Sequence, residues 1–194
     1  MKGKILQKFG LAAAIGGLAL CSGMATMAQD AEKPTAANQM AQGSSDATFA
    51  KHAAQGGMAE VKMGQLAQDK GSSDSVKMFG QRMVQDHSAA NDKLKSVAAQ
   101  ESITLPTRLS AKDQATYDRL SKLSGHAFDR AYAQDMVQDH VNDIAEFKKE
   151  AANGTDSAIK GFATETLPTL QDHLKMARQM LHTVSPSSAA AGGH

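Results

Sequence analysis

The feature that most limits how this chain can fold is a long run of sequence with almost no proline. Between residues 46 and 184 only Pro106 and Pro168 occur, and helix-favouring alanine, leucine, methionine, glutamine and lysine are abundant. Apolar residues recur there at steps of three and four, the spacing of one face of an α-helix. The sequence therefore predicts one all-α domain over residues 46–184.

Short polar stretches divide this domain into four long helices and one short helix. GSSDS (71–75) and NGTDS (153–157) hold residue types that end one helix and begin the next, and Pro106 breaks the chain between the two halves. Ser110, followed by Asp113, is typical of the start of a short helix. The expected helices cover residues 46–70, 75–100, 110–123, 125–152 and 157–181.

The two helix-connecting stretches resemble each other, and so do the residues that follow them. SVKMFG after the first stretch corresponds to AIKGFA after the second. Either the chain contains a duplicated helical hairpin, or the stretches are alike because such loops use few residue types. Two hairpins joined by a longer connection predict an antiparallel four-helix bundle, with the short helix in its crossover.

The first 28 residues have the pattern of a secretory signal peptide. Lysines precede the apolar run 9–21, which is too short for a membrane anchor, and small residues precede an expected cleavage before Gln29. LALC, ending at Cys21, also resembles a lipobox, although Leu20 stands where lipoprotein signals have a small residue, so lipidation is kept as an alternative. We expect an exported, periplasmic protein without a transmembrane anchor after processing, with outer-membrane association as an option.

The composition that remains after signal removal excludes several function classes. Cys21 is the only cysteine, so the mature chain can form neither a disulfide nor a cysteine-ligated metal site. Without the signal lysines, acidic residues slightly outnumber basic ones, and no basic stripe marks a surface for nucleic acid. The polar and small residues at 29–45 predict a flexible linker, and those at 185–194 predict a disordered tail.

Four ionisable side chains interrupt the apolar faces, one on each long helix. They are Glu60, His87, His140 and His173. Counted from the helix-connecting loops, the first three fall at one level of the bundle, whereas His173 lies further along its helix unless a kink at Pro168 brings it back. The sequence predicts a metal site with Glu60, His87 and His140 as ligands and His173 as an optional fourth.

These residues suit more than one metal ion, and they also suit a buried hydrogen-bond network without a metal. Imidazole with carboxylate suits zinc or iron, and Met83, Met136 and Met176, within one turn of the histidines, add copper as an option. Buried histidines also occur as hydrogen-bonded core residues, and methionines often fill the core. A buried polar network without metal is therefore the alternative.

An aspartate precedes each of the three histidines. Asp86, Asp139 and Asp172 are turned about 100° from their histidines around the helix axis. We expect them at the edge of the apolar face, where Asp86 can pair with Arg82 one turn away.

Four motifs of the chain resemble one known family. They are FAKHAAQGGMAEVKMGQLA, VKMFGQRMVQDHSAANDKL, FDRAYAQDMVQDHVNDIAEF and LPTLQDHLKMA. They are similar to DUF4142, a group of exported bacterial proteins that are often labelled outer-membrane proteins and assigned to the ferritin-like superfamily. The resemblance implies a ferritin-like antiparallel bundle with one long crossover, and no settled activity. Ferritin-like di-iron sites carry Glu-x-x-His on two helices, whereas here Val84, Val137 and Leu170 stand three residues before the histidines.

The expected function is that of a non-catalytic cell-envelope protein, with a role in stress or in binding an envelope protein partner. The alternative is a periplasmic bundle that binds zinc, iron or copper in its core. A ferritin-like metallo-oxidase has the least support, because the di-iron ligand set is incomplete. The chain also shows neither a nucleophile elbow nor a phosphate-binding loop.

Overall fold

The computed structural model describes residues 36–185, with side chains from residue 45 onward. The expected signal peptide, Cys21 and the tail from residue 186 lie outside the described residues. Within the described range the chain forms helices and no strand, and none of these helices is long and apolar enough to cross a membrane. The helices are α1 (Ala36–Lys70), α2 (Asp74–Gln100), α3 (Ala111–Ser121), α4 (Gly125–Asn153) and α5 (Ser157–Val184).

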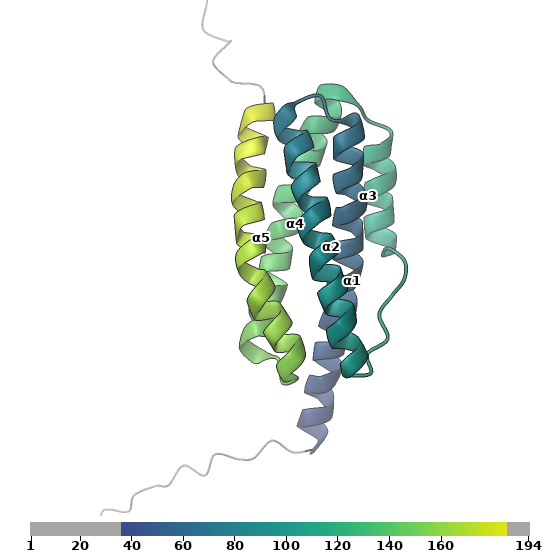
Figure 1. Ribbon diagram of the computed structural model, residues 1–194, viewed down its shortest axis with the longest axis vertical. Coiled ribbons are helices and arrows are strands. Elements are labelled where there is room, and N and C mark those ends of the chain that lie inside the picture. Colours follow the sequence, from purple (N-terminus) through teal and green to yellow (C-terminus); the bar gives the residue numbers. More distant parts are fainter. Residues whose placement is uncertain (1–35, 186–194) are drawn as a thin grey trace, which may run out of the picture. The chain divides into compact units, whose positions relative to one another are not determined.

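The four long helices form an antiparallel bundle, with α3 on its outside (Figure 1). α1 packs mainly against α2, and α4 packs mainly against α5, which makes two helical hairpins. α2 also contacts α5, and α1 contacts α4, so each helix has antiparallel neighbours. The connection after α2 runs back along the bundle into α3, which packs on α1. The expected all-α four-helix bundle with a long crossover and a short extra helix is confirmed.

Side-chain caps determine where the helices begin. Ser73, Ser110 and Asp156 each accept a hydrogen bond from backbone N–H groups in the first turn of α2, α3 and α5. These N–H groups have no partner within the helix, so the caps satisfy them. At the start of α4 the chain turns through Gly125, whose φ of 59° suits a residue without a side chain. The boundaries of these helices therefore follow from local sequence.

The first helix is longer than expected. α1 begins at Ala36 rather than at Asp46, so the part of the linker between residues 36 and 45 is helical. Extending an existing helix adds one hydrogen bond per residue and avoids the cost of nucleation. The alanine, glutamine and methionine residues of this stretch favour that extension. At the other end of the chain, α5 runs through Pro168 to Val184 without a break.

Each hairpin has one buried aspartate that forms hydrogen bonds with the loop of the other hairpin. At the start of α4, Asp129 accepts hydrogen bonds from Ser72 N at 2.9 Å, Ser72 Oγ at 2.6 Å and Ser73 N at 2.9 Å. In α1, Asp46 accepts hydrogen bonds from the N–H and hydroxyl of Thr155, at 3.1 and 2.7 Å, and from the N–H of Asp156 at 2.7 Å. The two sets of contacts mirror each other at opposite ends of the bundle, which supports the interpretation of two similar hairpins.

The hydrophobic core consists of two clusters of apolar side chains. One cluster includes Phe79, Met83, Phe128, Tyr132 and Met136. The other includes Phe49, Leu94, Phe147, Phe162 and Leu170. On each long helix, one buried ionisable side chain lies between buried apolar residues of one cluster and buried apolar residues of the other: Glu60, His87, His140 or His173. The fold therefore encloses a polar layer at mid-height between two apolar clusters.

Candidate metal centre

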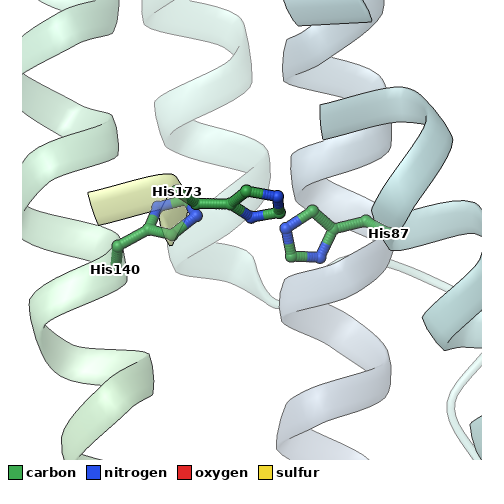
Figure 2. A group of neighbouring side chains, drawn as sticks. All are labelled: His87, His140 and His173. Carbon is green, nitrogen blue, oxygen red and sulfur yellow. The ribbon is translucent and has the colours of Figure 1, made fainter. Parts of the chain in front are cut away.

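The polar layer contains all four residues that the sequence singles out. Glu60 on α1, His87 on α2, His140 on α4 and His173 on α5 are at most 4% exposed. The imidazole rings of the three histidines meet in the centre of the bundle (Figure 2), with ring centroids 5.2 to 6.0 Å apart. We call these three histidines the triad.

His173 lies at the same level of the bundle as Glu60, His87 and His140, although it is further along its helix when residues are counted from the loop. Side chains on a helix tilt towards its N-terminus. Because α4 and α5 are antiparallel, the side chains of His140 and His173 tilt towards each other. Their rings can therefore meet at one level even when their Cα atoms lie at different heights along the bundle. Leu170, one turn before His173, packs in one core cluster, and Ala177, one turn after it, packs in the other, which places His173 in the polar layer.

Each imidazole has one nitrogen held and the other nitrogen free. His140 Nδ1 donates to Met136 O at 2.9 Å, His173 Nε2 lies 2.8 Å from Asp86 Oδ2, and His87 Nδ1 lies 2.9 Å from Glu60 Oε2. His87 Nε2, His140 Nε2 and His173 Nδ1 are buried without a hydrogen-bond partner. One ligand-capable atom from each ring lies within 4.8 Å of the others. Metal-binding histidines commonly have one nitrogen held by a carboxylate or carbonyl and present the other to the ion.

Burial keeps the triad neutral at neutral pH. It lowers the pKa of His87 and of His173 to about 4, against the opposing effect of nearby aspartates, and it also lowers the pKa of His140. A neutral imidazole carries the lone pair that a metal ion requires.

Glu60 contacts two members of the triad. Its Oε1 lies 3.4 Å from His140 Nε2, and its Oε2 holds His87 Nδ1. Burial raises the pKa of Glu60 to about 8, so these contacts are not simple ion pairs at neutral pH. When protonated, Glu60 donates to His87; when ionised, it accepts from His87 Nδ1 and leaves the lone pair on His87 Nε2. A cation at the triad favours the ionised form.

Asp86 has two partners, of which the sequence predicted only Arg82. It forms the expected pair with Arg82 one turn away on α2. It also reaches across to α5 and holds His173 Nε2. Burial by itself would raise the pKa of Asp86, but the hydrogen bonds from Arg82 and His173 together have the larger effect, and the net pKa is lowered. Asp86 is therefore a carboxylate at neutral pH. Asp172, by contrast, is exposed.

A group of carboxyl groups adjoins the triad and shares Glu60 with it. Glu60, Asp139 and Asp143 place oxygen atoms within 4.8 Å of one another. Burial, reinforced by the negative charge of neighbouring carboxylates, raises the pKa of both Asp139 and Asp143. Asp143 was not among the sequence candidates, although its position one turn after Asp139 and His140 is a signal that could have found it.

The remaining candidates lie elsewhere. Met83 and Met136 belong to an apolar cluster, and Met176 packs against the same cluster, which is the packing role that methionine often has. His52 pairs with Glu146 at 3.0 Å near the surface. The residues three before the triad histidines are apolar, so the side chains present do not fit the Glu-x-x-His pairs of a di-iron site.

Comparisons with known proteins place the chain in a family. A DUF305 protein from Streptomyces coelicolor, described as secreted, has a similar solved structure, with a TM-score of 0.61 and 16% sequence identity. The alignment covers 72% of this chain and 93% of that chain, and at this identity it shows a shared fold alone. No curated protein matches the chain. The family model of DUF4142, a domain of unknown function, matches residues 29–180, and the chain therefore belongs to the DUF4142 family.

Proposed function

We propose that this protein is an exported helical bundle that binds one divalent transition-metal ion through His87, His140 and His173, without catalysing a reaction. The observation that carries the proposal is a group of three buried histidines that place ligand-capable nitrogens within 4.8 Å of one another and that each hold one nitrogen without a hydrogen-bond partner. A buried polar atom without a hydrogen bond costs about 1–3 kcal/mol. One metal ion would satisfy all three nitrogens at once.

The donor set favours zinc, with copper and iron as the alternatives. Three neutral imidazoles, each with one nitrogen hydrogen-bonded to a second partner, suit Zn²⁺, and Glu60 Oε1, 3.4 Å from His140 Nε2, is an additional oxygen donor beside them. The absence of cysteine after signal cleavage excludes thiolate ligands. Export is supported by the signal-like N-terminus and agrees with the secreted protein of similar fold.

Elemental analysis of protein purified without an affinity tag tests the proposal. After incubation with Zn²⁺ and removal of the excess, we expect about one zinc per chain, as a single closed site predicts. The double variant His87→Gln/His140→Gln is expected to retain none. The matched control is His126→Gln/His182→Gln, because both of these histidines are exposed on the same bundle. If the wild-type protein retains no stoichiometric metal, the proposal is contradicted. The alternative is then a non-catalytic envelope protein whose buried histidines form a hydrogen-bond network.

Asp86→Asn is a second prediction, because it weakens the support of one ligand and leaves the ligand in place. We expect a ten- to hundredfold loss of Zn²⁺ affinity, the usual effect of removing a residue that orients a metal-binding histidine. Competition with a chelator of known affinity measures the change. Asp172→Asn is the control, since Asp172 adjoins His173 in sequence but is exposed. Equal affinities of the two variants would show that Asp86 does not support the site.

A further inference from the structure

One cavity connects the polar layer with the surface of the bundle. It has a volume of 30 Å³, and both Glu60 and His87 line it. His52 on α1 and Glu146 on α4 also line it, and their side chains are 57% and 40% exposed. A space of this size holds about one water molecule, which excludes an organic ligand and suits a small ion. The cavity next to Lys112 and Asp113 is lined by none of the triad residues.

The polar side chains of this cavity form a series of cation ligands from outside to inside. Glu146 and His52, hydrogen-bonded at 3.0 Å, stand at the rim, and Asp143 lies further in, one turn from Glu146 on α4. At the inner end Glu60 Oε1 and His87 Nε2 are buried without hydrogen-bond partners. Carboxylates along a narrow opening attract and concentrate cations.

The cavity has free space beside Gly56. Gly56 lines it, and a Cβ added there would meet no atom within 4 Å. At the neighbouring Gly57, a Cβ would lie 2.1 Å from Asn91 Oδ1, so that position is closed by packing. A Cβ at residue 56 therefore fits without displacing a neighbour, and a longer side chain there is expected to extend into the space of the cavity.

We propose that the cavity lined by His52, Gly56, Asp143 and Glu146 is the route by which a divalent metal ion enters and leaves the triad. The proposal rests on the proposed metal centre and adds the path and the groups that select a cation along it. Glu146 and His52 receive the ion at the surface, and Asp143 passes it to Glu60 and the triad. Only ligand exchange is involved, and the ion keeps its charge throughout.

Rapid mixing of the metal-free protein with Co²⁺ tests this route, because the visible absorption of bound Co²⁺ reports its arrival at the ligands. For Gly56→Leu we expect uptake and chelator-driven release to slow by the same factor, on the order of tenfold or more, with Kd and final stoichiometry unchanged. Gly161→Leu is the matched control, since a Cβ at Gly161 on α5 also meets no atom within 4 Å but Gly161 does not line the cavity. Glu146→Gln is expected to slow uptake several-fold at low salt and to reduce its dependence on salt.

The outcomes separate this inference from the metal centre itself. Rates for Gly56→Leu equal to those of wild type and of Gly161→Leu would overturn the route while leaving the metal centre intact. A changed Kd without parallel slowing of uptake and release would also overturn it. Failure of the wild-type protein to bind either Co²⁺ or Zn²⁺ would overturn both proposals.

Discussion

Asp129→Ala is expected to lower the free energy of unfolding by about 3 kcal/mol, because it leaves the backbone N–H groups of Ser72 and Ser73 without their charged acceptor. Asp129 is fully buried, so its truncation also leaves a gap between α4 and the α1–α2 loop. Urea denaturation of the metal-free protein measures the loss. Asp74→Ala in the same loop region is the control, since Asp74 is exposed.

The effect of Asp129 has a definite pH dependence. Burial by itself raises the pKa of Asp129, but the hydrogen bonds from Ser72 and Ser73 outweigh it and the pKa is lowered. A carboxyl group with a lowered folded-state pKa stabilises the fold above its unfolded pKa of about 3.9. That stabilisation is lost as the pH falls through the folded-state pKa. The difference between wild type and Asp129→Ala should therefore be full at pH 7 and shrink in strong acid; a loss no larger than that of Asp74→Ala would refute the assigned role.

Zinc is expected to raise the melting temperature of the wild-type protein by roughly 10 °C. A ligand that binds only the folded state stabilises it by about 4 kcal/mol when present at a thousandfold excess over Kd. For a chain of this size each kcal/mol shifts Tm by about 2–4 °C. In His87→Gln/His140→Gln the zinc-dependent shift is expected to vanish, because two of the three imidazole donors are gone. Calorimetry with Zn²⁺ and then with excess chelator measures it.

The control for this shift is His126→Gln/His182→Gln, which should melt like the wild type in both conditions. Both double variants are compared in their metal-free forms first, so that any intrinsic loss of stability is subtracted. If Zn²⁺ shifts the melting of both double variants equally, the ion acts at surface sites and the triad is not its ligand set.

The placement of the triad has a mechanical consequence. His87 belongs to the hairpin of α1 and α2, whereas His140 and His173 belong to the hairpin of α4 and α5. An ion bound by all three therefore links the two hairpins at mid-height, between the loops that Asp46 and Asp129 hold at the ends. If the triad binds an ion as proposed, removing that ion is expected to loosen the contact between the hairpins more than the contact within either one.

Much of this architecture could be predicted from the sequence by itself. Helical spacing of apolar residues predicted the four long helices, and the polar stretches 71–75 and 153–157 together with Ser110 indicated where helices end and begin. The same spacing placed Glu60, His87, His140 and His173 on buried faces, because the face of a regular helix follows from residue number alone. Assignment to the ferritin-like superfamily and the binding of a metal stay predictions.

Only the tertiary structure decided how side chains from different helices meet. Several of these contacts join helices or loops that are distant in sequence. They are the hydrogen bond between His173 and Asp86, the approach of Asp143 to Glu60, and the hydrogen bonds of Asp46 and Asp129 to the loops of the opposite hairpins. Such contacts depend on the rotation of each helix and on the direction in which antiparallel helices tilt their side chains, and neither is encoded in the spacing along one helix. The sequence determined that each long helix carries one ionisable residue in the middle of its apolar face; packing decided that these four side chains meet, and which nitrogen atoms have no hydrogen-bond partner.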